Sequence, residues 1–266
     1  MTPSEIRELL ARHGVRPSKA LGQNFLADEN TARRIVRLAE LQPGARVVEI
    51  GPGVGSLTVV LAAAGAHVCA IEIDRHLLPI LEEVVSGLDV EIVQADARTV
   101  DWAARLGPRS WTMVANLPYN VATTVVLGVL ESAPMVERLL VMVQREVGER
   151  LAARVGDDAY GAVSVKVAFH AEARVVGTVS PNVFIPKPNV ESALVRLVRH
   201  DRAPVEVRDP GAMFDLVRAG FATRRKTLRN TLDGRVDAER FARAAVDPGA
   251  RAETLSLEDW ARLADA

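Results

Sequence analysis

The fold of this 266-residue chain is decided by the stretch RVVEIGPGVGSLT at residues 46–58. Its first five residues, with three β-branched aliphatic side chains, are typical of a core strand, and helical signals begin after the glycines. A glycine-rich turn between a strand and a helix lets a ligand approach the backbone, with the N–H groups of the helix nearby. The stretch therefore predicts an open α/β sheet that binds a ligand at the carboxyl end of this strand.

A polar residue lies at or just after the end of each of the next three predicted strands. Glu72 lies near the end of the second strand, residues 67–73. It is about 20 positions beyond Gly51, the spacing at which a carboxylate can bind both ribose hydroxyls of an adenosine. Asp96 follows the third strand and Asn116 the fourth. We expect these residues at one edge of a parallel sheet, although Glu72 and Asp96 could instead cap helices. Before the first strand, Asp28 is expected to be the N-cap of a helix that runs to about Leu41.

Asn116 begins a tetrad, Asn116-Leu117-Pro118-Tyr119, that suits alkylation of an exocyclic amine such as adenine N6. The lone pair of that nitrogen is delocalised into the ring, so the amine is a poor nucleophile until it pyramidalises. The Asn116 amide oxygen and the Leu117 carbonyl can accept its two N–H bonds and stabilise the charge that grows during transfer. Pro118 stiffens the loop, and Tyr119 offers a face on which a base can stack. An ordinary strand followed by a proline turn is the alternative interpretation.

Glu49 places a charge inside the first predicted core strand. A buried charge needs a partner. The carboxylate could brace the glycine loop, but the sequence does not select its partner.

Composition is typical of a soluble globular protein, with 48% hydrophobic and 25% charged residues. The formal net charge is −1, so any surface that binds nucleic acid must be local. The single cysteine, Cys69, excludes an intramolecular disulfide and is expected to be a small buried hydrophobe. We find neither a signal peptide nor an apolar segment long enough to span a bilayer. We therefore expect a cytoplasmic protein without membrane contact.

The second half of the chain contains two further predicted strands, at residues 174–179 and 193–198. Between them, Phe184 begins a loop at residues 184–192 that two prolines, Pro186 and Pro188, make rigid enough to present its ring. A phenylalanine before prolines is more often a core residue, which is the alternative interpretation. Residues 160–170 alternate like a strand, although the family resemblance given below favours a helix. A polar segment at residues 200–211 reads as a linker, and the remainder is predicted to be helical.

Four cations lie close together in this helical region: Arg224, Arg225, Lys226 and Arg229. A solvated helix face is the default interpretation of such a run. On a continuous helix Arg225 and Arg229 would share a face with Lys226 beside them, so three cations could follow one RNA backbone.

Two classes of nucleotide-using enzyme fit the first half of the chain. A nicotinamide-dependent dehydrogenase would also have the strand, the glycine loop and the acidic strand end. Here the glycines read Gly-x-Gly-x-Gly, because Ser56 and not glycine is the sixth residue, and no obvious element for hydride chemistry is present. A methyl donor that contains adenosine fits the same acid, and Asp96 can then serve its adenine.

Motifs along nearly the whole chain resemble the ribosomal RNA adenine N6-dimethyltransferase family. They are Leu21–Leu26, Val48–Thr58, Ile71–Asp74, Ala95–Asp96, Asn116–Asn120, Gln144–Leu151, Phe184–Leu197 and Phe221–Asn230. The resemblance implies a class I, Rossmann-like methyltransferase fold, in which an α/β sheet is mostly parallel with an antiparallel last strand. It implies an S-adenosylmethionine-binding domain with an N-terminal arm at residues 1–200, and a small all-α domain that contacts RNA or the ribosome at residues 201–266.

The resemblance also implies roles for single residues. The donor, S-adenosyl-L-methionine, would be bound by Gln23, Asn24, Leu26, Gly51, Gly53, Glu72, Asp96 and Asn116. The catalytic residues would be Asn116, Leu117, Pro118, Tyr119 and Phe184, with the target base stacked between the two aromatic rings. RNA would be bound by Arg224, Arg225, Lys226 and Arg229.

The implied activity is N6,N6-dimethylation of two adjacent adenosines in the hairpin loop near the 3′ end of small-subunit (16S) rRNA, within the small ribosomal subunit or its precursor. Family members that modify large-subunit rRNA and give macrolide resistance are the nearest alternative. Asn120 and the stretch at residues 224–230 are more similar to the small-subunit enzymes. A ribosome-assembly factor that binds without methylating is the alternative outside the enzymes, and the intact tetrad argues against it. We expect a monomer that needs no metal.

Overall fold

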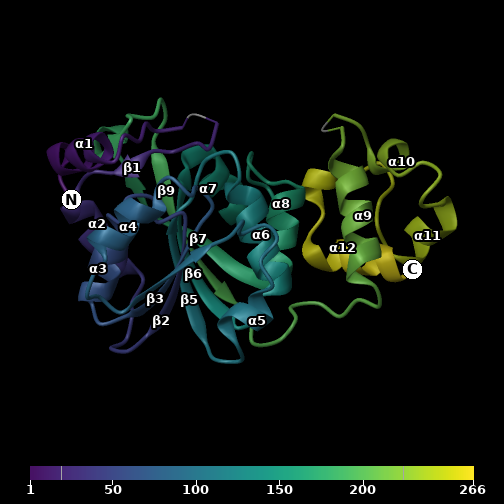
Figure 1. The fold of residues 1–266 in the computed structure, drawn as a ribbon. Helices are drawn as coiled ribbons and strands as arrows, with labels where there is room; N and C mark the ends of the chain where they lie inside the picture. The colour runs from purple at the N-terminus through teal and green to yellow at the C-terminus, as the bar shows by residue number, and fades with distance from the viewer. Residues whose placement is uncertain (19, 224) are drawn as a thin grey trace. The chain divides into compact units, whose positions relative to one another are not determined.

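The computed structural model describes residues 1–18, 20–223 and 225–266. The chain divides into two compact units (Figure 1). Unit 1 contains Met1–Gly148 and Arg174–Val198, and unit 2 contains Glu149–Ala173 and Arg199–Ala266. None of the helices within the described residues is long and apolar enough to cross a membrane.

Unit 1 is built on a seven-stranded sheet with the order β4-β3-β2-β5-β6-β9-β7. The strands are β2 (Arg46–Ile50), β3 (His67–Glu72), β4 (Val90–Gln94), β5 (Trp111–Asn116), β6 (Val136–Gln144), β7 (Ala171–Val179) and β9 (Ser192–Arg199). Strands β4, β3, β2, β5 and β6 pair in parallel, whereas β9 is antiparallel to β6. The predicted α/β sheet with an antiparallel strand near its end is confirmed.

Helices alternate with the strands in the first part of the chain. They are α1 (Pro3–Arg12), α2 (Glu29–Leu38), α3 (Thr58–Ala63), α4 (Leu78–Val84), α5 (Trp102–Leu106), α6 (Ala122–Ser132) and α7 (Arg145–Ala152). The predicted N-cap at Asp28 is confirmed, because its carboxylate accepts a 2.6 Å hydrogen bond from the Thr31 N–H at the start of α2. That helix ends earlier than the expected residue 41, because Glu40 adopts a positive φ of 53°.

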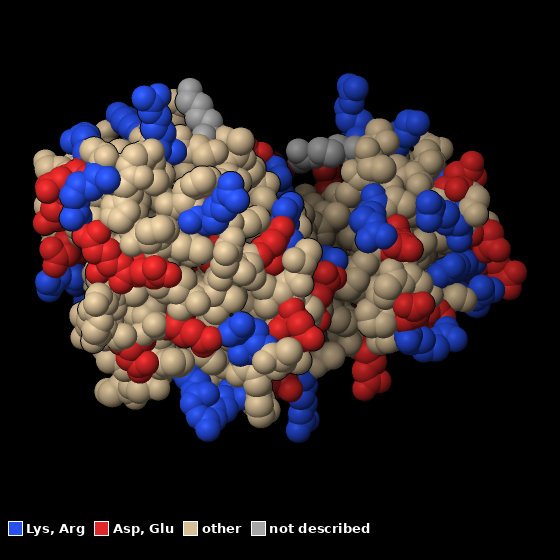
Figure 2. All heavy atoms as spheres, viewed as in Figure 1, with Lys and Arg blue, Asp and Glu red and all other residues tan. Residues whose placement is uncertain are grey.

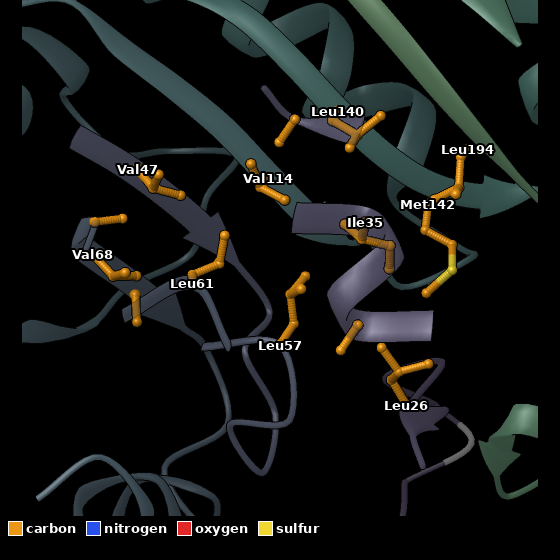
Figure 3. Packing of buried hydrophobic residues seen from close by; sticks show 14 of the residues in the cluster. Leu26, Ile35, Val47, Leu57, Leu61, Val68, Val114, Leu140, Met142 and Leu194 are labelled. Atoms are coloured by element: carbon orange, nitrogen blue, oxygen red, sulfur yellow. The ribbon is translucent and has the colours of Figure 1, made fainter. Parts of the chain in front are cut away.

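The strands and helices of unit 1 share a core in which aliphatic side chains from both layers meet (Figure 3). Val47, Val68 and Val114 project from the central strands toward Leu61 of α3 and Ile35 of α2. These side chains are between 0% and 1% exposed. Close packing of this kind resists displacement, so the carboxyl ends of the strands are held in fixed positions.

A second, two-stranded sheet joins segments that are far apart in the sequence. Strand β1 (Phe25–Leu26) pairs antiparallel with β8 (Phe184–Ile185), so that Leu26 lies opposite Phe184. The Ala27 N–H extends the contact with a 2.7 Å hydrogen bond to the Val183 carbonyl. The proline loop thereby fixes the N-terminal segment, a pairing that the sequence pattern did not predict.

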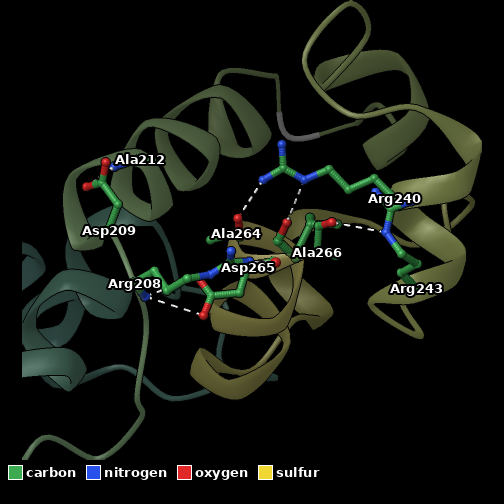
Figure 4. A network of polar contacts seen from close by, with 9 residues as sticks. Arg208, Asp209, Ala212, Arg240, Arg243, Ala264, Asp265 and Ala266 are labelled. Carbon is green, nitrogen blue, oxygen red and sulfur yellow. Dashed lines mark hydrogen bonds and ion pairs between the residues drawn. The ribbon is translucent and has the colours of Figure 1, made fainter.

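Unit 2 is helical and has its own core. Its elements are α8 (Ala162–His170), α9 (Pro210–Phe221), α10 (Leu228–Thr231), α11 (Ala238–Arg243), the short 3₁₀ helix η2 (Ala252–Thr254) and α12 (Leu257–Asp265). The ambiguous segment at residues 160–170 is thus helical. Arg240 ties α11 to the end of α12, because its guanidinium donates to the carbonyls of Leu263 at 2.9 Å and Ala264 at 2.7 Å (Figure 4).

The predicted boundary between residues 200 and 201 assigned to the first domain one segment that the structure assigns to unit 2. Residues 149–173 belong to unit 2. The reason is packing: Val165 of α8 is buried in one cluster with Met213 and Trp260, and the Tyr160 hydroxyl donates to the Leu255 carbonyl at 2.9 Å. Sequence order alone assigned this segment to the preceding domain.

Candidate functional site

Unit 1 contains a cavity of about 330 Å³ at the carboxyl ends of its parallel strands. This is the edge at which open α/β sheets bind ligands. The N-terminal loop, residues 20–24, forms part of its wall. The predicted residues that line the cavity are Gln23, Asn24, Leu26, Gly51, Gly53, Glu72, Asp96, Asn116, Leu117, Pro118 and Tyr119. The structure therefore brings together all the predicted donor-binding residues and the whole tetrad.

Glycine is required in this loop both by the backbone conformation and by close packing. Gly51 and Gly53 have positive φ angles of 69° and 60°, a region that residues with a side chain rarely adopt. A Cβ atom on Gly53 would lie 2.9 Å from the ring of Phe25. A side chain at this position would thus displace the segment that begins the two-stranded sheet.

Glu72 is buried beneath this loop, with 4% of its surface exposed. One carboxylate oxygen accepts a hydrogen bond from the Gly53 N–H at 3.1 Å, and the other accepts one from the Asp74 N–H at 2.9 Å. Burial raises the pKa of Glu72, and the backbone N–H groups oppose that shift. Glu72 therefore braces the glycine loop at Gly53.

Glu49 is a buried acid at the cavity. It is 1% exposed, and its Oε2 atom has no hydrogen-bond partner among the described residues. Burial raises the pKa of Glu49 to about 8; a hydrogen bond with the Thr58 side chain opposes this shift, and the negative charge of Glu72 adds to it. The Ser56 hydroxyl also lines the cavity and is likewise without a partner in the described part of the chain. These two orphaned polar groups are suited to a ligand that brings hydrogen-bonding atoms.

Asp96 is held by a residue that sequence reasoning missed. The Arg98 guanidinium donates to both carboxylate oxygens, at distances of 2.6 to 3.1 Å. These hydrogen bonds lower the pKa of Asp96. Arg98 also lines the cavity. Its position two residues after Asp96 was the available signal, because an arginine so close in a turn can reach the carboxylate.

Within the tetrad, the Asn116 side chain has a defined orientation. Its amide nitrogen donates to the Asn24 carbonyl at 3.0 Å, which leaves the amide oxygen in the role of acceptor. The Leu117 N–H donates to the Met142 carbonyl at 3.0 Å and so continues the pairing of β5 with β6. The tetrad is thus attached both to the N-terminal loop and to the sheet.

Further hydrogen bonds attach the N-terminal loop to the rim of the cavity. The Gln23 amide donates to Asp74 at 2.8 Å, and the Asn120 amide donates to the Ala20 carbonyl at 3.1 Å. Gly22 allows the close approach, because a Cβ atom there would lie 2.9 Å from the Asn120 side-chain oxygen. The loop is therefore built into the site and is not merely a connection to α1.

Phe184 lies elsewhere. It is 3% exposed, belongs to the main hydrophobic cluster of unit 1, and is not among the residues that line the cavity. Its backbone pairs with Leu26, which does line the cavity. The predicted stacking of Phe184 on a base is not supported by this conformation, because the ring is enclosed by aliphatic side chains.

The cationic cluster has a different local structure from the one expected. Arg224 lies outside the described residues. Arg225 and Lys226 lie in a turn and a bend before α10, and this helix has only four residues, of which Arg229 is one. The helix cannot extend backward, because Thr227 is extended with a ψ of 161°. The prediction that Arg225 and Arg229 share a helix face is therefore wrong. All three described cations are nevertheless exposed.

Surface charge agrees with the net charge of −1. In the view of Figure 2, Lys and Arg side chains alternate with Asp and Glu side chains on each unit. Other arginines of unit 2 are engaged in ion pairs, for example Arg218 with Asp215 and Arg243 with Glu239. The cluster before and within α10 is thus a local concentration of positive charge on a mixed surface.

Comparison with known proteins identifies the family. Residues 15–266 match the family described as "Ribosomal RNA adenine dimethylase". The chain belongs to this family. A protein of Thermobifida fusca named "Ribosomal RNA small subunit methyltransferase A" is 46% identical over 100% of this chain and 95% of its own length. A Geobacillus protein of the same name is 41% identical over 100% of this chain and 96% of its own length.

Solved structures support the same fold. The 23S rRNA methyltransferase ErmE superposes with a TM-score of 0.68 and 31% identity, covering 91% of this chain and 98% of the other. A dimethyladenosine transferase from Plasmodium falciparum superposes with a TM-score of 0.76 and 22% identity, covering 90% of this chain and 95% of the other. The chain therefore shares its overall fold with these rRNA methyltransferases.

Proposed function

We propose that this protein transfers methyl groups from S-adenosyl-L-methionine to N6 of two adjacent adenosines in the hairpin loop near the 3′ end of 16S rRNA, and that it acts in the cytoplasm during ribosome biogenesis. One observation carries the chemistry: Glu72, Asp96 and Asn116 line one cavity beside the glycine loop. The substrate rests on the relatives at 41–46% identity, which are named for the small subunit. The 23S enzyme is less similar, at 31% identity.

The cavity fits the methyl donor. We assign Gly51 and Gly53, which line the cavity, to its methionine part, and the Glu49 and Ser56 side chains offer unsatisfied polar atoms at the same cavity. Glu72 uses each carboxylate oxygen once, and an ionised carboxylate has about four acceptor sites, so acceptors remain for the ribose hydroxyls. We assign Asp96 to the adenine and the loop residues Gln23, Asn24 and Leu26 to the cover of the donor site. When bound, the donor supplies an electrophilic methyl group on a sulfonium.

The tetrad then prepares the acceptor. A loop adenosine leaves its stack at a cost of a few kcal/mol, and its base stacks on Tyr119. The Asn116 amide oxygen and the Leu117 carbonyl accept hydrogen bonds from N6, which directs the nitrogen lone pair outward. The N6–methyl bond forms as the sulfur–methyl bond breaks, and N6 then loses a proton. Because the Asn116 amide is already oriented by Asn24, little reorganisation is needed as charge develops.

The same proposal assigns RNA binding to unit 2. Arg225, Lys226 and Arg229 are exposed there, and phosphate contacts of lysine and arginine supply most sequence-independent affinity for nucleic acid. Arg224 belongs to the same prediction from its sequence position. We expect the protein to act as a monomer without a metal ion.

The test is methylation of purified small subunits that lack the modification. The subunits are incubated with protein and donor, and modified adenosines are located by mass spectrometry of RNA fragments. We expect two adjacent N6,N6-dimethyladenosines in the 3′ hairpin loop, and no product with the Asn116→Ala variant. Methylation of large-subunit RNA alone would reassign the substrate, and tight binding without methyl transfer would favour an assembly factor.

A further inference from the structure

A hydrogen bond of 2.9 Å joins the Tyr119 hydroxyl to the hydroxyl of Ser192. Ser192 is the first residue of β9 and is 0% exposed. It is not among the residues that line the cavity. Tyr119, in contrast, lines the cavity and is only partly buried. The bond therefore links a group at the site to a group behind it.

The position of Ser192 is itself firmly fixed. Ser192 lies opposite Gln144 in the pairing of β9 with β6. The preceding residue, Glu191, contacts Arg145, the first residue of α7, twice: its carbonyl accepts a 3.0 Å hydrogen bond from the Arg145 N–H, and its carboxylate pairs with the Arg145 guanidinium at 3.0 Å. The Tyr119 hydroxyl is thus anchored to the edge of the sheet and not to a loose loop.

The hydrogen bond to Ser192 constrains the direction of the Tyr119 ring, which Pro118 does not constrain. Proline restricts the backbone of the tetrad, but the direction of the Tyr119 ring depends on two side-chain torsions. The hydroxyl is the only polar atom of that side chain, and among the described residues its hydrogen bond is to Ser192, so this bond gives the ring a directional contact. A functional side chain that is held by a supporting contact keeps its productive geometry without losing freedom at the moment of reaction.

We propose that Ser192 is a positioning residue for methyl transfer, which holds the Tyr119 ring at the angle on which the target adenine stacks. This inference rests on the proposed function, because it concerns the same acceptor site. It predicts that the hydroxyl of Tyr119 matters for orientation, whereas its ring matters for stacking.

A double-mutant cycle tests the proposal. Ser192→Ala and Tyr119→Phe each remove the bond while keeping the serine backbone and the aromatic ring, and the double variant removes both partners. The single-turnover methylation rate is measured at saturating small subunits and donor, and donor affinity is measured separately. We expect a rate about 10-fold lower in each single variant, no further loss in the double variant, and unchanged donor affinity, because misplacement by about 1 Å can cost up to 10²-fold.

Ser164→Ala provides the matched control. Ser164 is a 1% exposed serine of unit 2 whose hydroxyl donates to the Arg150 carbonyl at 2.7 Å. Its loss should lower thermal stability without changing the methylation rate. Ser192 has only a structural role if Ser192→Ala lowers stability alone, and the two hydroxyls act independently if their effects on the rate multiply. A wild-type protein that does not methylate small subunits would defeat the proposed function instead.

Discussion

Replacing Glu49 by glutamine should change how the stability of the protein depends on pH. Glu49 is 1% exposed, and burial raises its pKa from 4.5 to about 8. The folded protein therefore binds a proton that the unfolded chain releases above pH 4.5. Stability from this group is fully present below pH 4.5 and is lost as the pH rises toward 8. Glutamine has nearly the same shape and cannot titrate.

The magnitude follows from the size of the pKa shift. One pH unit corresponds to about 1.4 kcal/mol for one proton, so the wild type should lose about 5 kcal/mol from this group between pH 4.5 and 8. About 3 kcal/mol of that is lost by pH 7. The glutamine amide is neutral at every pH, so its burial does not become more costly as the pH rises, and the Thr58 hydroxyl beside residue 49 remains available to it. The variant should therefore become more stable than the wild type as the pH rises.

Urea unfolding of both proteins at half-unit intervals from pH 5 to pH 8 measures the effect. The difference between the two curves isolates residue 49, because every other titrating group is present in both proteins. Glu5→Gln is the control: hydrogen bonds from Thr2 lower the pKa of Glu5 from 4.5, so the stability contributed by this carboxylate is lost only as the pH falls below that value, and its curve should run parallel to that of the wild type from pH 5 to pH 8. Parallel curves for the wild type and Glu49→Gln would refute the buried, protonated state of Glu49.

Three further experiments test the remaining assignments. Glu72→Gln should weaken donor binding by about 10- to 100-fold, because hydrogen bonds to a charged group contribute about 1.5–3 kcal/mol, and calorimetry that finds wild-type affinity would remove Glu72 from the donor site. Phe184→Ala should lower the free energy of unfolding by about 3–5 kcal/mol, because a large ring leaves the core, and urea curves that match the wild type would instead favour an exposed stacking role. Arg225→Ala with Arg229→Ala should weaken subunit binding and reduce its salt slope by about 0.7–0.9 for each lost phosphate contact, with Arg218→Ala as the ion-paired control; a slope equal to the wild type would place the RNA surface elsewhere.

The sequence alone predicted the part of the fold that depends on periodicity and short-range geometry. Apolar runs ended by glycine or by an acid marked the parallel strands, and Asp28 marked the start of α2. Because the carboxyl ends of parallel strands meet at one edge, Gly51, Glu72, Asp96 and Asn116 could be assigned to one site before any coordinates were known. The structure places all four of these residues at one cavity.

The tertiary structure decided what depends on contacts between distant segments. The pairing of Leu26 with Phe184, 158 positions later, buries a ring that the sequence placed at the active site. Packing of α8 against α9 and α12 moved residues 149–173 into unit 2. The extended backbone at Thr227 separates Arg225 and Lys226 from α10, whereas the charge pattern had suggested one continuous helix. Contacts between distant segments leave no periodic pattern in the sequence, so their partners and energies are set only when the chain has folded. Strand ends and helix caps, in contrast, depend on neighbouring residues and can be predicted from them.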